Sequence, residues 1–264
     1  MSKNPIDKLS GFVVVTGASS GIGLEIAKLA AKDGCDLLIV ADRDLAAAES
    51  TLRDCGAASV ERIEVDLGTA KGIDDLMNKI GEREVDALVA NAGHGLGDAF
   101  FLQQWEDIAH VIDTNVKGTV SLVHKIGARM VLRDKGRILV TGSIAGDMPG
   151  AYQLVYNSTK AFVNDFCVGL ANEIKHTPVV ISCLMPGVTD THFFERAGME
   201  DTNAGKMDNK ADPAKVARDG YRALLKGETQ EVSGFMNKVQ DLFADILPDA
   251  LVAQMHRRLA QPER

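Results

Sequence analysis

The sequence predicts an α/β fold of three layers, in which a doubly wound, mostly parallel sheet lies between two layers of helices. Three observations lead to this prediction. Strand-like and helix-like segments alternate at regular intervals, the strand-like segments are short continuous apolar runs, and no linker or internal repeat divides the 264 residues. Continuous apolar runs are typical of parallel strands that helical crossovers bury on both faces. We therefore expect a single domain over residues 1–264.

Residues 12–30 contain a strand, a glycine-rich turn and the start of a helix, to which the other motifs of the chain relate. The segment opens with an apolar, β-branched run that predicts a buried strand ending at Thr16. Gly17, Gly21 and Gly23 then bend the chain, and helical spacing of apolar residues follows. Such a turn directs free N–H groups and the positive end of a helix dipole toward a bound phosphate. The glycines alone are equally compatible with an ordinary turn of a parallel α/β protein.

The later elements continue the alternation. Apolar runs predict strands at Cys35–Ala41, Ser59–Val65, Ala87–Ala90, Gly136–Thr141 and Val179–Leu184. Helical spacing predicts helices at Asp42–Cys55, Thr69–Glu82 and Tyr152–Lys175, and one or two long helices over Trp105–Leu132 that are broken or interrupted near Asn115. Residues 94–104 are expected to be irregular. Four large apolar residues in this region are expected to pack in the core, with a substrate-lining role as the alternative: Phe100, Phe101, Leu102 and Trp105.

Two segments depart from the alternation. Residues 198–212 are polar and aperiodic, and a connection of this length is usually a lid or disordered. We expect a mobile substrate loop around 188–212. The tail around 235–260 predicts a helix that is interrupted at Pro248, with an apolar face made by Phe243, Ile246, Leu247 and Val252.

The bulk properties exclude several classes of protein. A net charge of −8 and a pI near 5.3 argue against a surface for nucleic acid or for an anionic membrane. The first residues lack the apolar core of a signal peptide, and no apolar run approaches the length of a membrane span. Without a secretory signal, the four cysteines are expected to be reduced. We expect a cytoplasmic protein.

The carboxyl ends of all six predicted strands carry small or polar residues, and ligands of open parallel sheets bind at these ends. The end of the second strand is informative about a nucleotide. Asp42 can accept hydrogen bonds from both ribose hydroxyls of an adenosine and repels a 2′-phosphate, although it also fits a helix N-cap. Arg43 can instead pair with a 2′-phosphate. No basic residue lies within Ala18–Ile22 to assist Arg43, so NAD is favoured over NADP.

Tyr156 and Lys160 are four residues apart in a predicted helix and therefore share one face of it. A nearby ammonium favours the phenolate and lowers the pKa of a tyrosine toward the working range of a base. Ser143, at the end of the preceding strand, offers a hydroxyl that can hold a carbonyl oxygen. A surface pair of residues and a turn cap are the alternative interpretations.

With these residues in view, nearly the whole chain resembles the short-chain dehydrogenase/reductase family. The matching motifs, in order, are Thr16–Gly23 (T-G-A-S-S-G-I-G), Asp66-Leu67, Asn91–Gly93, Asn115, Ser143, Tyr156–Lys160 and Pro186–Thr191. The resemblance implies a Rossmann-type sheet of about seven strands and a hydride transfer between NAD(P) and a carbonyl or secondary alcohol. It implies cofactor contacts at Gly17, Ser19, Ser20, Gly21, Ile22, Gly23, Asp42, Arg43, Asp66, Leu67, Asn91, Ala92, Gly93, Tyr156, Lys160, Pro186, Gly187, Val188 and Thr191.

The resemblance also implies the catalytic roles. Tyr156 would exchange a proton with the substrate oxygen, and Lys160 would lower the tyrosine pKa and bind the nicotinamide ribose. Ser143 would orient the carbonyl, and Asn115 would hold a water in the proton relay. Apolar residues beside these positions suggest a largely apolar substrate: Met148, Tyr152, Leu154, Phe193 and Phe194.

The family further implies a homodimer or homotetramer formed through the long helices near Val111–Leu132 and Tyr152–Lys175. The histidines show no metal-ligating spacing, so no metal is expected. The competing hypothesis is a sensor or scaffold that binds a dinucleotide on the same fold without catalysis. The presence of Ser143, Tyr156 and Lys160 argues against it.

Overall fold

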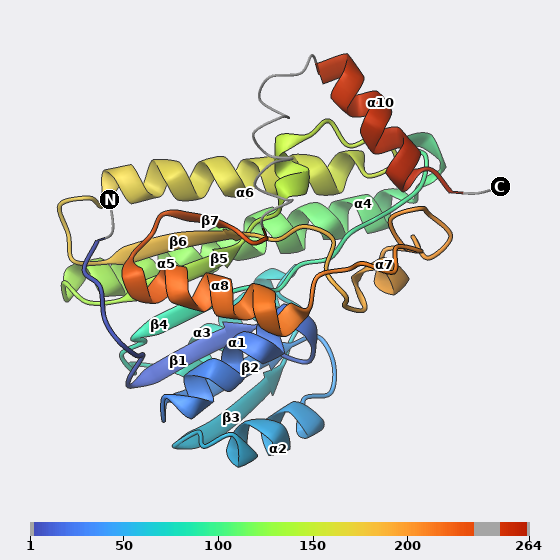
Figure 1. The fold of residues 1–264 in the computed structure, drawn as a ribbon. Helices are drawn as coiled ribbons and strands as arrows, with labels where there is room; N and C mark the ends of the chain where they lie inside the picture. The colour runs from blue at the N-terminus through green and yellow to red at the C-terminus, as the bar shows by residue number, and fades with distance from the viewer. Residues whose placement is uncertain (1–2, 235–248, 263–264) are drawn as a thin grey trace.

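The computed structural model describes residues 3–234 and 249–262, in which a seven-stranded sheet forms the middle of three layers (Figure 1). The strand order is β3-β2-β1-β4-β5-β6-β7, and every neighbouring pair is parallel. The strands are β1 (Phe12–Thr16), β2 (Asp36–Ala41), β3 (Ser59–Glu64), β4 (Ala87–Ala90), β5 (Arg137–Thr141), β6 (Val180–Met185) and β7 (Gln230–Val232). The predicted doubly wound sheet is confirmed.

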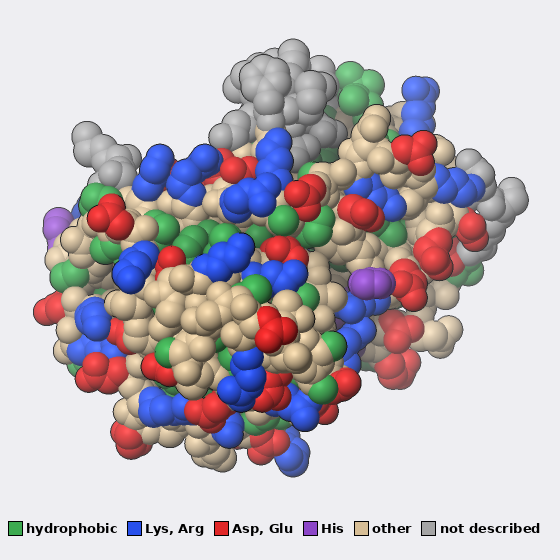
Figure 2. Space-filling view, turned by 60° about the horizontal axis from the view of Figure 1, so that its bottom comes forward, with side chains coloured by type: hydrophobic (Ala, Val, Ile, Leu, Met, Phe, Trp, Pro, Cys, Tyr) green, Lys and Arg blue, Asp and Glu red, His purple; other side chains and the backbone are tan. Residues whose placement is uncertain are grey.

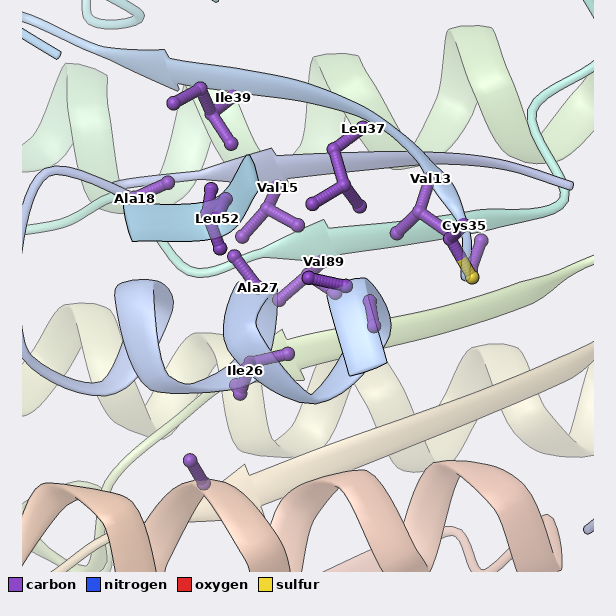
Figure 3. Close-up of a cluster of buried hydrophobic side chains, with 14 of the residues drawn as sticks. Val13, Val15, Ala18, Ile26, Ala27, Cys35, Leu37, Ile39, Leu52 and Val89 are labelled. Carbon is purple, nitrogen blue, oxygen red and sulfur yellow. The ribbon is translucent and has the colours of Figure 1, made fainter. Parts of the chain in front are cut away.

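Helices cover both faces of the sheet because the strands are apolar on both faces. One face carries α1 (Gly21–Lys32), α2 (Ala46–Asp54) and α8 (Pro213–Lys226). The other carries α3 (Ala70–Ile80), α5 (Thr119–Leu132) and α6 (Leu154–Glu173), with α4 (Trp105–Ile112) beside α6. Along β1, Val13 and Val15 pack into the first layer, shown in Figure 3, whereas Val14 packs into the second.

The predicted long helix over 105–132 is interrupted at Asn115, as the sequence indicated. Asp113–Gly118 forms a π-helical turn between α4 and α5. Such turns insert one extra residue into a helix and often occur at functional sites. Here the turn places Asn115 inside the protein, 1% exposed, rather than on the helix surface.

Sequence analysis did not identify α8 and β7, although α8 carries clear signals at both ends. Asp212 caps the helix by accepting a hydrogen bond from the Ala214 amide at 2.9 Å, and Pro213 is its first residue. Gly227 follows in the left-handed conformation at φ +69°. The strand β7 has only three residues and no buried apolar run, so its pattern is too short to predict.

The prediction that Phe100, Phe101, Leu102 and Trp105 pack in the core is wrong. These side chains are 38%, 94%, 59% and 67% exposed. They lie on a 3₁₀ turn and the first residue of α4, which run over the outside of the domain. A sequence pattern shows that residues are apolar but not whether the chain or a partner covers them.

The segment 198–212 packs against the last described helix, α10 (Asp249–Ala260). The Asn203 side chain donates a hydrogen bond to the Arg258 carbonyl at 2.7 Å, and the Ala204 amide donates to the Leu259 carbonyl at 3.0 Å. The mobility of this loop stays a prediction. Of the predicted tail, Val252 is buried, whereas Phe243, Ile246, Leu247 and Pro248 lie outside the described residues.

A buried histidine attaches α10 to the helix that carries Tyr156. The Asn157 side-chain amide nitrogen donates to the Met148 carbonyl at 3.1 Å and lies 3.2 Å from Nε2 of His256. Because the Met148 carbonyl requires a donor, the amide nitrogen faces Nε2, which must then accept. The other ring nitrogen, Nδ1, lies 3.1 Å from the Ala151 carbonyl and donates to it. This arrangement accommodates only the neutral imidazole.

Burial accordingly lowers the pKa of His256 below its ordinary value of 6.5, although the Ala151 carbonyl partly opposes the shift. Because the unfolded chain binds the proton first, the stabilisation is complete above about pH 6.5 and is lost as pH falls through the lowered folded pKa. We expect the free energy of unfolding in urea to fall between pH 7.5 and pH 5.5, and to fall less in His256→Gln. Equal losses in both proteins would show that His256 does not carry the effect.

No described helix combines the length and apolar character needed to cross a bilayer. On the face shown in Figure 2, basic and acidic side chains are interspersed rather than gathered by sign.

Candidate active site

The turn after β1 is shaped so that only glycine fits. Gly17 and Gly21 have φ values of +65° and +58°, in the left-handed region that favours glycine. A Cβ on Gly23 would lie 2.3 Å from the Gly17 carbonyl oxygen, and one on Gly21 would lie 3.0 Å from the Thr191 methyl carbon. The backbone therefore forms a cradle at the start of α1 that side chains would fill, which suits a closely bound phosphate.

Asn91 joins the ends of three strands around this cradle. Its amide nitrogen donates to the carbonyls of Thr16 and Gly17 at 3.2 and 3.3 Å, and its amide oxygen accepts from the Thr141 hydroxyl at 3.0 Å. The Thr16 hydroxyl in turn accepts from the amides of Asn91 and Ala92, both at 2.9 Å. Asn91 thus holds the cradle in place. Its contact with a cofactor stays a prediction.

The π-helical turn directs the Asn115 side chain at the strand end after β4. Its amide oxygen accepts from the His94 amide at 3.0 Å, and its amide nitrogen donates to the His94 carbonyl at 2.9 Å and to the Thr159 hydroxyl at 3.1 Å. A Cβ on Gly93 would lie 2.8 Å from this amide oxygen. Asn115 therefore connects the loop after β4 to α6, the helix of Tyr156 and Lys160.

Ser143, Tyr156 and Lys160 converge at the ends of β5 and β6 and are 7%, 9% and 6% exposed. The Ser143 hydroxyl accepts from the Ala145 amide at 3.1 Å, lies 3.4 Å from the Pro186 carbonyl, and is near enough to the Tyr156 hydroxyl to favour its phenolate. Asn164, on α6, donates to the Ser143 carbonyl at 2.9 Å and so fixes the serine backbone. The predicted catalytic residues Asn115, Ser143, Tyr156 and Lys160 are thus brought into one connected site.

The electrostatics differ from the sequence-based expectation on one point. Burial raises the pKa of Tyr156 to about 12, and the nearby Ser143 hydroxyl opposes this rise only in part. Burial also lowers the pKa of Lys160 to about 8. The Lys160 ammonium lies 5.9 Å from the Tyr156 ring centroid and donates to the Thr141 carbonyl at 2.7 Å. In this structure the cost of burying the phenolate dominates, so the pKa of Tyr156 is raised rather than lowered as the sequence predicts.

The predicted adenosine end lies at the carboxyl ends of β2 and β3. Arg43 pairs with both oxygens of Asp42, with Nε–Oδ1 and Nη2–Oδ2 distances of 2.7 and 2.9 Å. Its hydrogen bond and charge lower the pKa of Asp42, which stays ionised. Asp66 accepts from the Gly68 amide at 2.8 Å and lies 3.2 Å from Nε2 of His110. The next residue, Leu67, is buried.

The loop after β6 closes the site from the other side. The Ile144 amide donates to the Pro186 carbonyl at 3.1 Å, and Thr191 faces Gly21 across the cradle. The short helix α7 (Phe193–Arg196) follows. Its first ring, Phe193, lies 5.0 Å from the Tyr156 ring centroid to centroid, and its last residue, Arg196, donates to the Ser20 hydroxyl at 3.2 Å.

Only part of the predicted apolar substrate wall surrounds Tyr156. Phe193 packs on the tyrosine ring, and Met148 and Tyr152 are half-buried nearby in the chain. Phe194 instead packs in a core cluster with Met199 and Ala204. Leu154 is 47% exposed and lines a groove outside the site with Phe100, Ile112, Val116 and Phe162.

Sequence reasoning missed three residues that shape the site: Thr159, Asn164 and Arg196. A signal for two of them was present in the sequence. Thr159 lies within the Y-N-S-T-K motif and Asn164 lies one helical turn beyond it, and this spacing could have indicated that both lie near the site. Arg196 carried no such signal, because its proximity to Ser20 arises only from the fold. Among the described residues, no group of three His, Cys, Asp or Glu side chains is arranged to hold a metal ion.

A doubly wound parallel sheet with a glycine cradle where the strand order reverses, between β1 and β4, defines a dinucleotide-binding α/β protein. A family model for short chain dehydrogenases matches residues 11–201. The NADP-dependent 3-hydroxy acid dehydrogenase YdfG of Salmonella typhi is 33% identical over 199 residues, covering 74% of this chain and 79% of that protein.

Solved structures agree with this match. A short-chain dehydrogenase from Sphingobium yanoikuyae in complex with NADPH has a TM-score of 0.79 at 25% identity, over 91% of this chain and 97% of that one. One from Burkholderia phymatum in complex with NAD shares the fold with a TM-score of 0.81 at 21% identity, over 98% of this chain and all of that one. The chain belongs to the short-chain dehydrogenase family of NAD(P)-dependent oxidoreductases.

Proposed function

We propose that the protein transfers a hydride between the nicotinamide of NAD(P) and a carbonyl or secondary alcohol, with Tyr156 as general acid and base. The observation that carries this proposal is the convergence of three buried side chains, Ser143, Tyr156 and Lys160, at the strand ends, where Ser143 acts on the Tyr156 hydroxyl and the Lys160 ammonium lies 5.9 Å from the tyrosine ring centroid. Two hydroxyls placed in this way can hold one carbonyl oxygen between them. The bound dinucleotide supplies or accepts the hydride.

The protein residues position the substrate oxygen and transfer the proton. In reduction the substrate carbon gains a hydride while Tyr156 gives its hydroxyl proton to the oxygen, and oxidation reverses both transfers. Ser143 donates a hydrogen bond to the same oxygen and polarises the carbonyl. Lys160 provides the cation that stabilises the phenolate left after proton donation. Asn115 holds the loop after β4 against α6 through its hydrogen bonds to His94 and Thr159. Its role in a water relay stays a prediction.

The raised pKa of Tyr156, about 12, predicts different pH dependences for the two directions. Oxidation requires the phenolate, so its kcat should rise with pH from about 6 to about 10, whereas that of ketone reduction, which requires the phenol, should stay nearly constant over this range. Initial rates across this range, measured at saturating cofactor in both directions, test the assignment. Parallel profiles in the two directions would contradict a general acid and base at this position.

The most direct test of the proposed function is a panel of ketones, aldehydes and alcohols, assayed at the nicotinamide absorbance band with NADH and NADPH in parallel. The contact of Phe193 with the Tyr156 ring supports a largely apolar substrate. We expect the best turnover with apolar ketones or secondary alcohols. Preferred turnover of small charged substrates would contradict the substrate class, and binding of dinucleotide without turnover of any substrate would favour the sensor or scaffold alternative.

We further propose that copies of the chain associate through the α4–α6 surface. Its exposed apolar residues support this proposal: Trp105, Ile112, Leu154, Phe162 and Val168, which are 40–67% exposed. An apolar surface of this kind is typical of protein–protein contacts. Light scattering on the purified protein is expected to give a dimer or tetramer, and a monomer would contradict the proposal. The cytoplasmic location stays a prediction from the sequence.

A further inference from the structure

Arg196 reaches from the substrate side of the site to the glycine cradle. It lies at the end of α7, and its Nη2 donates to the Ser20 hydroxyl at 3.2 Å across 176 residues of sequence. Ser20 is the N-cap of α1, and its side chain caps no helix amide. The serine hydroxyl and the guanidinium are therefore both available to a ligand in the cradle.

Arg196 also adds a second guanidinium to the Asp42–Arg43 pair at the end of β2. Burial lowers the pKa of Arg196 and the Arg43 cation lowers it further, whereas the Asp42 and Glu195 carboxylates raise it, so Arg43 and Asp42 act electrostatically on Arg196. Arg43 already occupies both oxygens of Asp42 and neutralises that carboxylate. Because the Asp42 carboxylate is paired with Arg43, the Arg196 guanidinium, which donates to the neutral Ser20 hydroxyl, brings a further positive charge to this end of the site.

In this fold, the ribose of the adenosine lies at the end of the second strand, with its 2′ position facing the residues there. A free carboxylate at this place selects the 2′-hydroxyl of NAD by accepting from it and repelling phosphate. A neutralised carboxylate with an additional arginine does the opposite, because a guanidinium binds phosphate oxygens with charge-assisted hydrogen bonds. The segment Ala18–Ile22 contains no basic residue, and Arg196 supplies one from outside it.

We propose that Arg196, together with Arg43 and the Ser20 hydroxyl, binds the 2′-phosphate of NADP(H) and makes the protein prefer NADP(H) to NAD(H). This proposal rests on the proposed function, since it assigns a specificity residue within the same dinucleotide site. It differs from the choice of cofactor that the sequence alone favours. The competing possibility is that Arg196 contacts the pyrophosphate, which both dinucleotides share.

The test is isothermal titration calorimetry of the full chain with NADPH, NADH, 2′,5′-ADP and 5′-AMP. The variants are Arg196→Gln and Arg43→Gln, with Arg222→Gln as control, since Arg222 is an exposed arginine on α8 that pairs with Asp219. Wild type should bind NADPH more tightly than NADH. Arg196→Gln should weaken binding of NADPH and 2′,5′-ADP about tenfold or more, as expected for the loss of a charge-assisted hydrogen bond. NADH and 5′-AMP should change less than about twofold.

The other outcomes distinguish a failure of this inference from a failure of the proposed function. Equal weakening of NADPH and NADH in Arg196→Gln would place the arginine at the pyrophosphate and overturn this inference. Unchanged NADPH binding, or a wild-type protein that prefers NADH, would overturn it as well, while leaving the proposed function intact. A wild-type protein that binds no dinucleotide would overturn both. Thermal melting of each free variant checks that the exposed substitutions leave the fold unchanged.

Discussion

Tyr156→Phe is expected to lower kcat by about 10²–10⁴-fold, the range for removal of a general acid or base, while dinucleotide affinity changes little. The substitution removes only the Tyr156 hydroxyl, whose pKa Ser143 influences. The contacts of the ring with Phe193 and with the Lys160 ammonium remain, so the site keeps its shape. Steady-state kinetics with the best substrate of the panel and calorimetric titration of the dinucleotide provide the two measurements.

A second buried tyrosine offers a matched control. Tyr221, on α8, is 6% exposed, and its hydroxyl donates to the Asp33 carboxylate at 2.6 Å. Tyr221→Phe makes the same chemical change away from the site and should cost about 1–3 kcal/mol of stability, because the hydrogen bond to a charged group is lost. Its kcat should match wild type. Turnover by Tyr156→Phe within about threefold of wild type would contradict the assigned role of this tyrosine.

Gly23→Ala is expected to remove the dinucleotide cradle. The added methyl group would lie 2.3 Å from the Gly17 carbonyl oxygen and 2.5 Å from the Asn91 amide nitrogen. The first is backbone, and the second holds the strand ends together, so neither can move freely. We expect a loss of about 1–3 kcal/mol in the free energy of unfolding, as for other overpacked sites. Binding should weaken about tenfold or more, since about 1.4 kcal/mol is already a factor of ten.

Gly169→Ala is the control for a methyl group added to a helical glycine. Gly169 lies in α6, and a Cβ there would meet no atom within 4 Å. Alanine should stabilise this helix by up to about 1 kcal/mol and leave dinucleotide binding unchanged. Urea unfolding and calorimetric titration of both variants measure the difference. Wild-type affinity in Gly23→Ala would show that the phosphate does not bind in this cradle.

Much of the fold was readable because it depends on local signals. The continuous apolar runs predicted six of the seven strands, since a strand that is covered on both faces must be apolar on both. The interruption near Asn115 was also visible in the sequence. The helix α8 was missed although Asp212, Pro213 and Gly227 mark its ends, and the short strand β7 had too few residues for a period.

The exposure of individual apolar residues could not be predicted from the sequence pattern. Phe101 and Trp105 have the composition of core residues, but the structure places them on its surface. The free energy gained by removing a side chain from water does not depend on which chain covers it. Sequence pattern therefore predicts that such a residue will be buried, but not whether by its own domain or by another copy.

The sequence by itself determined the class of this protein. The spacing of Gly17, Gly21 and Gly23, and of Tyr156 and Lys160, reports short-range geometry that one turn or one helix produces. The tertiary structure decided which other residues contact these motifs and how deeply the motifs are buried. It brought Arg196 to Ser20 and buried Tyr156 so that its pKa rises. Charge and burial at a site depend on residues distant in sequence, because a folded chain sets them by proximity in space.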